Sequence, residues 1–187
     1  MTQNVHRYKY LYEEVRAKKV FDLICLFFKI SILFRFNDGP MPYEYIYMQK
    51  TICFSNSNLY EIYTKSVNWN FESCAIIKLK LKRINFPYPE QYFVLAHCVY
   101  SLLHEIGHFY HSLTFKNRDE TIEFMKSYDS LRKMNRKASE DHLITDRQAS
   151  LIYETLPGEK EANDFAIANF LPSFEYVLKA LKKDNPK

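Results

Sequence analysis

The chain has 187 residues, of which 47% are hydrophobic and 26% are charged, and 26 Lys and Arg residues against 22 Asp and Glu give a formal net charge of +4. This balance is typical of one globular domain with a full hydrophobic core, and it excludes a disordered or fibrous chain. The charge is small and scattered, without the basic stripe of a nucleic-acid-binding protein, so we expect no nucleic-acid partner.

The N-terminal region, residues 1–85, predicts a mixture of helix and strand. Residues 5–19 have the pattern of an amphipathic helix. Residues 20–36 are the most apolar stretch, but charged residues interrupt it, so it predicts a buried helix or a helix–strand pair and not a membrane span of roughly 20 residues. Residues 43–54 are rich in Tyr and Ile and predict a strand between turn signals at 37–40 and 55–58.

Residues 74–84 carry the clearest strand pattern. Ile77, Leu79 and Leu81 alternate with Lys78, Lys80 and Lys82, as in a strand with one buried and one solvated face. A phosphate-binding patch is the alternative interpretation of the same basic run. By analogy with other folds, the edge of this strand near Lys82 could receive an extended substrate.

The C-terminal region, residues 86–187, predicts helices. A pattern over residues 90–113 is apolar around most of its circumference and predicts a central helix. The charged residues 116–149 predict a surface helix and a looser connection. After Pro157-Gly158 a helix is predicted over residues 159–171, followed by Pro172 and a last amphipathic helix. We therefore expect one domain, residues 1–187, of the α+β class, mostly helical with a small sheet.

The four cysteines bear on the compartment. Cys25, Cys53, Cys74 and Cys98 are widely spaced and form no C-x-x-C pair, and the opening residues have no signal-peptide pattern. We expect buried, reduced thiols in a cytoplasmic protein that does not associate with membranes.

The central helix contains the motif His104-Glu105-Ile106-Gly107-His108. Residues four apart share one face of a helix, so both imidazoles can bind one zinc ion at about 2.0–2.1 Å. Glu105 is rotated away from that face. It could instead take a proton from a water at the open coordination position and deliver it to the leaving amine, as the general base of a metallopeptidase.

A catalytic zinc ion needs a third protein ligand, and the candidates are His97, His111, His142, Glu159 and Glu161. We prefer Glu159 to Glu161, because Glu159 and Asn163 share a helix face, beside the small Ala162, that could pack on the motif helix. On that face Asn163 could hydrogen-bond a ligand histidine. A simple preference for acidic residues in the first helical turn is the alternative explanation of both glutamates.

The other histidines are less suited to ligation. His97 lies two turns before His104, and His142 lies in the charged connection, where we expect exposure. His111 lies a turn beyond His108 and either lines the cleft, supports a ligand, or is exposed. Tyr153 and His142 are both candidates to stabilise an oxyanion, and the sequence does not choose between them.

The motif and the later segment Glu159-Lys160-Glu161-Ala162-Asn163 resemble the gluzincin peptidases, in which a glutamate is the third zinc ligand. Within them, His104–His111 and residues 159–172 look most like the ImmA/IrrE family. The resemblance implies a zincin-like catalytic region over residues 86–187, endopeptidase activity on a specific protein, and an origin in bacteria or their mobile elements. His108 and Glu159 are 51 residues apart, a longer separation than that family leads us to expect.

Residues 96–103 also resemble the phage-exclusion peptidases of the Lit type, which cleave a translation factor. The sequence therefore predicts a zinc metalloendopeptidase that acts on a regulatory or mobile-element-linked protein, or a Lit-like peptidase that cleaves a host factor. The alternative is a zinc-stabilised regulatory or binding protein without catalysis. An intact Glu105 argues against that alternative, because a structural zinc site needs no general base.

Overall fold

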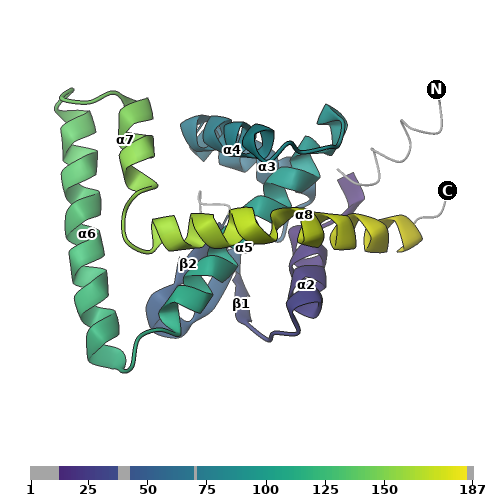
Figure 1. Cartoon of the computed structure of the whole chain (residues 1–187), viewed down its shortest axis with the longest axis horizontal. Coiled ribbons are helices and arrows are strands. Elements are labelled where there is room, and N and C mark those ends of the chain that lie inside the picture. The colour runs from purple at the N-terminus through teal and green to yellow at the C-terminus, as the bar shows by residue number, and fades with distance from the viewer. Residues whose placement is uncertain (1–12, 38–42, 70, 185–187) are drawn as a thin grey trace.

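The computed structural model describes residues 13–37, 43–69 and 71–184 (Figure 1). Over these residues it is a mostly helical α+β fold with one three-stranded sheet, which confirms the predicted class. The elements in chain order are α2 (Ala17–Phe28), β1 (Leu33–Phe36), β2 (Tyr43–Ile46), η2 (Tyr47–Gln49), β3 (Thr51–Phe54), α3 (Leu59–Trp69), α4 (Phe71–Arg83), η3 (Glu90–Tyr92), α5 (Phe93–Ser112), α6 (Arg118–Glu140), α7 (Asp146–Tyr153) and α8 (Glu159–Asp184).

Helices α5 and α8 cross at the centre of the molecule (Figure 1). Their approach depends on Gly107, because a Cβ built there would lie 2.6 Å from Cα of Ala162 and 2.9 Å from its carbonyl oxygen. Both helices bury a large apolar face, with Leu95, Leu102, Leu103 and Ile106 on α5 and Phe170, Phe174 and Val177 on α8. The predicted central helix over residues 90–113 is therefore confirmed as η3 and α5.

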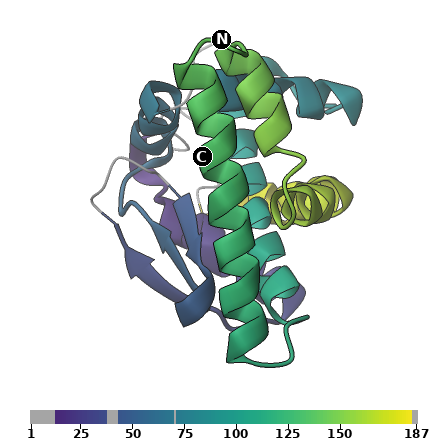
Figure 2. The same cartoon turned by 90° about the vertical axis from the view of Figure 1, so that its left-hand side faces the viewer.

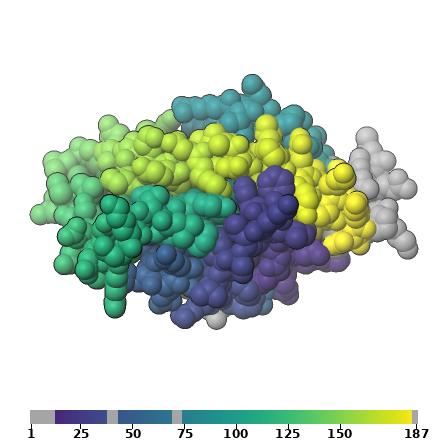
Figure 3. Space-filling view, turned by 60° about the horizontal axis from the view of Figure 1, so that its bottom comes forward, coloured from purple at the N-terminus to yellow at the C-terminus, as the bar shows by residue number. Residues whose placement is uncertain are grey.

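Helix α8 runs through Pro172, where the sequence predicts an end and a new helix. Ser173, Phe174, Val177 and Leu178 after the proline are buried, so packing keeps the chain helical. In Figure 3 the C-terminal segment forms one continuous band beside the dark blue N-terminal residues, and α2 and α8 are in contact.

The sheet has the order β1-β3-β2, with β1 parallel and β2 antiparallel to β3. The single strand predicted over residues 43–54 is thus two strands joined by η2. Lys50, with φ of 48°, closes that connection in the left-handed region. Strand β3 is buried along its length, whereas β1 is an exposed edge, and β2 lies beside α5. This places Tyr45 and Tyr47 against the motif helix.

The strand predicted over residues 74–84 is wrong, because this segment is the helix α4. Cys74, Ile77 and Leu81 recur at helical spacing; Cys74 and Leu81 are buried and Ile77 packs on the core, while Leu79 is 44% exposed. The alternating Lys and Leu residues fit both periods, and contact with α5 and α7 decides for the helix. The edge for substrate pairing predicted near Lys82 therefore does not exist.

The predicted surface helix is α6, which forms a hairpin with α7 at one end of the molecule (Figure 2). Asn117 caps α6 by accepting a hydrogen bond from the Glu120 amide, and Thr145 and Gln148 form a capping box on α7. The predicted first helix lies mostly outside the described residues; within them, α2 begins at Ala17. The turn predicted at residues 37–40 also lies largely outside them.

Residues 20–36 form α2 and β1, so the predicted helix–strand pair is confirmed. In the described ranges, no helix combines the length and apolarity that a membrane span requires. Cys53, Cys74 and Cys98 are buried as expected, but Cys25 is only half-buried.

Candidate metal centre

His104, His108 and Glu159 form a group that could hold a metal ion, with one ligand atom from each and all three atoms within 4.8 Å of one another. The two Nε2 atoms lie 3.1 Å apart, and Glu159 Oε2 lies 3.1 Å from Nε2 of His104. Glu159 Oε1 lies 3.6 Å from Nε2 of His108. The histidines share a face of α5, and the contact between Gly107 and Ala162 brings the first turn of α8 beside them.

A hydrogen-bond network fixes the tautomer of His104. Asn163 Oδ1 lies 2.9 Å from Lys80 Nζ, 3.1 Å from the Tyr100 hydroxyl and 3.2 Å from His104 Nδ1. An ammonium group only donates, so the Asn163 atom facing Lys80 is the oxygen. Nδ1 of His104 is then the donor, and Nε2 of the neutral ring keeps its lone pair toward His108 and Glu159. This is the role predicted for Asn163.

Tyr47 links the second ligand to His111. Its hydroxyl lies 2.9 Å from His108 Nδ1 and 3.1 Å from His111 Nδ1. Burial lowers the pKa of His111, so its neutral ring can accept the phenol proton while the phenol oxygen accepts from His108. Nε2 of His108 is then free to ligate. His111 is half-buried and shares the Tyr47 hydroxyl with His108, a member of the candidate ligand group.

Glu159 is 3% exposed and is held from the α6–α7 side. The Tyr128 and Tyr153 hydroxyls lie 2.6 Å and 2.8 Å from Glu159 Oε1. Burial raises the pKa of Glu159, but its interactions with the His104 and His108 rings outweigh burial and hold the pKa well below its usual value. Glu159 is therefore a carboxylate, the form that binds a cation.

Glu105 lies beside this group without belonging to it. Its carboxyl is buried on α5 and has no hydrogen-bond partner among the residues that the structure describes. Burial raises its pKa, and the neighbouring His104 and His108 oppose that rise. A buried carboxylate with a raised pKa and unused oxygens is suited to accept a proton.

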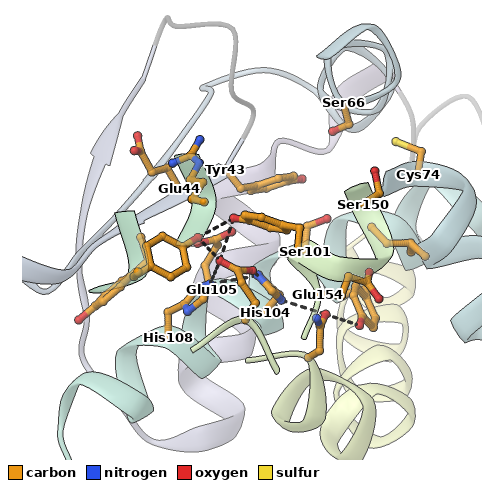
Figure 4. Close-up of a pocket in the computed structure, with 18 of the residues that line it drawn as sticks. Tyr43, Glu44, Ser66, Cys74, Ser101, His104, Glu105, His108, Ser150 and Glu154 are labelled. Carbon is orange, nitrogen blue, oxygen red and sulfur yellow. Dashed lines mark hydrogen bonds and ion pairs between the residues drawn. The ribbon is translucent and has the colours of Figure 1, made fainter. Parts of the chain in front are cut away.

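All four side chains line a cleft of about 560 Å³. In Figure 4, His104, Glu105 and His108 gather at one end of this cleft, and Ser66 and Cys74 lie at the other. Helix α5 forms its floor, β2 and α4 contribute walls, and the α6–α7 hairpin closes the remaining side. The volume falls within the range of about 300–1,000 Å³ that is usual for ligand sites.

Several predicted candidates lie apart from the ligand group. Glu161 is exposed, and its carboxylate accepts a hydrogen bond from the Gly158 amide at 2.6 Å, so it caps α8. His97 lies in the cleft wall, with Nε2 3.4 Å from Cys74 Sγ. His142 is exposed in the turn between α6 and α7, outside the cleft lining. Tyr153 contacts Glu159, as described above.

The sequence did not reveal Tyr47, Lys80 or Tyr128. Each reaches the site from a distant segment, 61 residues from His108 for Tyr47, 83 from Asn163 for Lys80 and 31 from Glu159 for Tyr128. The helical period of residues 74–81 was the one available signal for Lys80, because it places this residue near the face that packs on α5.

Comparison with known proteins identifies no relative: no family model, no curated protein and no solved structure matches the chain.

Proposed function

We propose that this chain is a zinc-dependent metallopeptidase. The observation that carries the proposal is the buried Glu105 carboxyl, which has no hydrogen-bond partner in the described part of the chain and lies beside a three-ligand group in a cleft. A site that held metal for structure alone would have no use for this glutamate, whose carboxyl lines the cleft and makes no hydrogen bond to the described residues.

The donor set favours zinc. Tetrahedral ligands at about 2.0–2.1 Å from zinc lie about 3.3 Å from one another. The two Nε2 atoms lie 3.1 Å apart and Oε2 of Glu159 lies 3.1 Å from Nε2 of His104, so two of the three ligand–ligand separations are close to that value. Two imidazoles and one carboxylate, each held by a further hydrogen bond, are the ligands of catalytic zinc sites that keep a fourth position open.

The residues divide the chemistry among them. A bound zinc ion supplies Lewis acidity, which polarises a carbonyl and lowers the pKa of water to about 7. Glu105 accepts the proton of the attacking water and passes it to the nitrogen of the leaving amine, since its raised pKa brings it nearer to neutral pH. Asn163 and Tyr47 keep both imidazoles oriented through the reaction.

The proposed substrate is a peptide bond in a protein. This part of the proposal rests on the resemblance of residues 104–111 and 159–172 to the ImmA/IrrE family and of residues 96–103 to Lit-type peptidases. A cleft that runs along α5 from His104 to His97 could accommodate several residues of an extended chain, which suits an endopeptidase.

The variant Glu105→Gln tests the proposal. It keeps the size of the side chain and removes its basicity, so we expect zinc content near that of the wild type and cleavage reduced by at least about 10²-fold. Zinc is measured by elemental mass spectrometry, and cleavage by mass-spectrometric profiling of a random peptide library. Glu175→Gln, at an exposed position on α8, is the matched control. Unchanged cleavage or biological effect in Glu105→Gln would favour a zinc-stabilised regulatory protein instead.

A further inference from the structure

The segment between the second and third ligands forms the α6–α7 hairpin. It stands at one end of the molecule, beside the N-terminal end of α8 (Figures 1 and 2). Neither of its helices has a fully buried residue, yet the hairpin contributes Met125, Tyr128 and Tyr153 to the cleft. A helix pair that buries so little and still reaches the ligand group suggests a role at that group.

Two phenols of the hairpin converge on one oxygen of the third ligand. Tyr128 on α6 and Tyr153 on α7 lie 2.6 Å and 2.8 Å from Glu159 Oε1, and their hydroxyls are 2.8 Å apart. Phenols are protonated at neutral pH, so each hydroxyl has one proton to donate. Two protons serve three contacts, and the charged oxygen is the strongest acceptor of the three. Both phenols therefore donate to Oε1.

This arrangement assigns different tasks to the two oxygens of Glu159. Oε1 accepts from the hairpin and lies 3.6 Å from Nε2 of His108, while Oε2 lies nearer the ligand group, 3.1 Å from Nε2 of His104. Without the phenols, the carboxylate could rotate about its last bond. The two phenols hold the carboxylate in one orientation and leave Oε2 as the better placed ligand oxygen.

The hairpin also packs on Tyr47 and His111, the residues beside His108. Phe124, one turn before Tyr128, packs on Tyr47 at 5.2 Å and on His111 at 4.9 Å between ring centroids. The Asn135 side chain donates to the Ala149 carbonyl at 2.8 Å and ties α6 to α7. Displacement of the hairpin would therefore disturb the surroundings of both His108 and Glu159.

We propose that Tyr128 and Tyr153 are positioning residues of the metal centre, so that docking of the α6–α7 hairpin sets its affinity for zinc and its ligand geometry. The inference rests on the metal site of the proposed function but not on hydrolysis. By linkage, zinc must then stabilise the docked hairpin as much as the docked hairpin stabilises bound zinc.

The test compares Tyr128→Phe, Tyr153→Phe and the double variant with the wild type. Each change keeps the ring and removes one hydroxyl. We expect zinc affinity, measured by competition with a chromogenic chelator, to fall by several-fold in each single variant and by about 10–100-fold in the double variant. The visible absorption bands of the cobalt-substituted protein should shift in the double variant, because the carboxylate then binds differently. Tyr60→Phe, at an exposed position of α3, is the control.

Amide hydrogen exchange supplies the reciprocal measurement. Zinc should slow exchange in α6 and α7 of the wild type, and the double variant should lose this protection even at saturating zinc. Wild-type affinity and spectrum in the double variant, or hairpin exchange that zinc leaves unchanged, would overturn the inference. If zinc binding responds to the phenols while Glu105→Gln keeps full cleavage, the inference holds and the peptidase proposal fails.

Discussion

Asn163 is not a candidate ligand, but its side-chain oxygen accepts three hydrogen bonds at the candidate centre. This oxygen accepts from Lys80 of α4 and from Tyr100 and His104 of α5. The Lys80 side chain is only 12% exposed. Its ammonium group forms an ion pair with Glu154 at 2.7 Å and lies over the Tyr100 ring, and these contacts compensate for the loss of solvent. The lysine fixes the amide, and the amide fixes the imidazole.

This chain of contacts predicts a graded response to substitution. Asn163→Leu removes the acceptor, and we expect zinc affinity to fall by about 10–100-fold. Asn163→Asp keeps an acceptor oxygen and should stay within a few-fold of the wild type. Lys80→Met allows the Asn163 amide to flip, so its zinc affinity should lie between those of Asn163→Leu and Asn163→Asp. Chelator competition measures the affinities. Lys78→Met, which removes an exposed lysine of the same helix, serves as control; an equal loss in both lysine variants would contradict the argument.

Gly107 makes a second prediction for a single residue. The variant Gly107→Ala should destabilise the protein by about 1–3 kcal/mol, although alanine favours a helix over glycine by about 1 kcal/mol. The reason is that the new Cβ would meet Cα, C and O of Ala162 at 2.6–3.2 Å. Urea unfolding measures the change. These contacts are to backbone atoms of Ala162, so the second change Ala162→Gly should not restore stability. Restored stability in the double variant, or a more stable Gly107→Ala protein, would show that α5 and α8 are farther apart than these distances.

At the scale of elements, periodicity predicts the helices that carry the ligands but not those that complete the site. Residues 93–112 are apolar around the helix, which leaves no other interpretation. Residues 74–84 satisfy a two-residue and a helical period at once, and the face that packs on α5 decides between them only in the folded chain. The predicted helix end at Pro172 is wrong for a related reason. Proline disfavours a helix locally, but buried side chains before and after it keep α8 continuous in the folded chain.

Pro172 inside α8 is therefore a position where a substitution should stabilise the protein. Pro172 is exposed, cannot donate to the Ala168 carbonyl and crowds the preceding turn. Pro172→Ala should therefore raise the free energy of unfolding by about 1–3 kcal/mol, the helix penalty of proline less its restriction of the unfolded chain. Thermal and urea unfolding measure the effect. Pro157→Ala, in the turn before α8, should bring no gain, and a gain of equal size there would remove the explanation.

Across the whole molecule, the site joins segments that no local pattern connects. The two histidines and Glu105 follow from a five-residue motif, and Glu159 and Asn163 from the spacing of one helix face. Tyr47, Lys80, Tyr128 and Tyr153 come from η2, α4, α6 and α7, and their roles depend on the tertiary arrangement. The sequence therefore predicts the candidate ligands, and the fold determines how these side chains are held.

The response of the whole molecule to acid should contain a separable contribution from His97. This ring is 2% exposed, contacts Cys74 of α4 and Tyr63 of α3, and leaves Nδ1 without a partner among the described residues. Burial lowers its pKa from 6.5 to about 4. The unfolded chain therefore takes up a proton before the folded one does, and stability that is fully present above pH 6.5 is lost as the pH falls toward 4.

A difference of about 2.5 pKa units corresponds to about 3 kcal/mol. The variant His97→Gln does not titrate, so its unfolding free energy should fall by about 3 kcal/mol less than that of the wild type between pH 7.5 and 4. Urea unfolding at a series of pH values measures both curves, and ionisations common to the two proteins cancel in the difference. Since the unfolded ring titrates near 6.5, the curves should begin to converge just below that pH. Parallel curves over the whole range would mean that His97 is protonated as readily in the folded protein as in the unfolded chain.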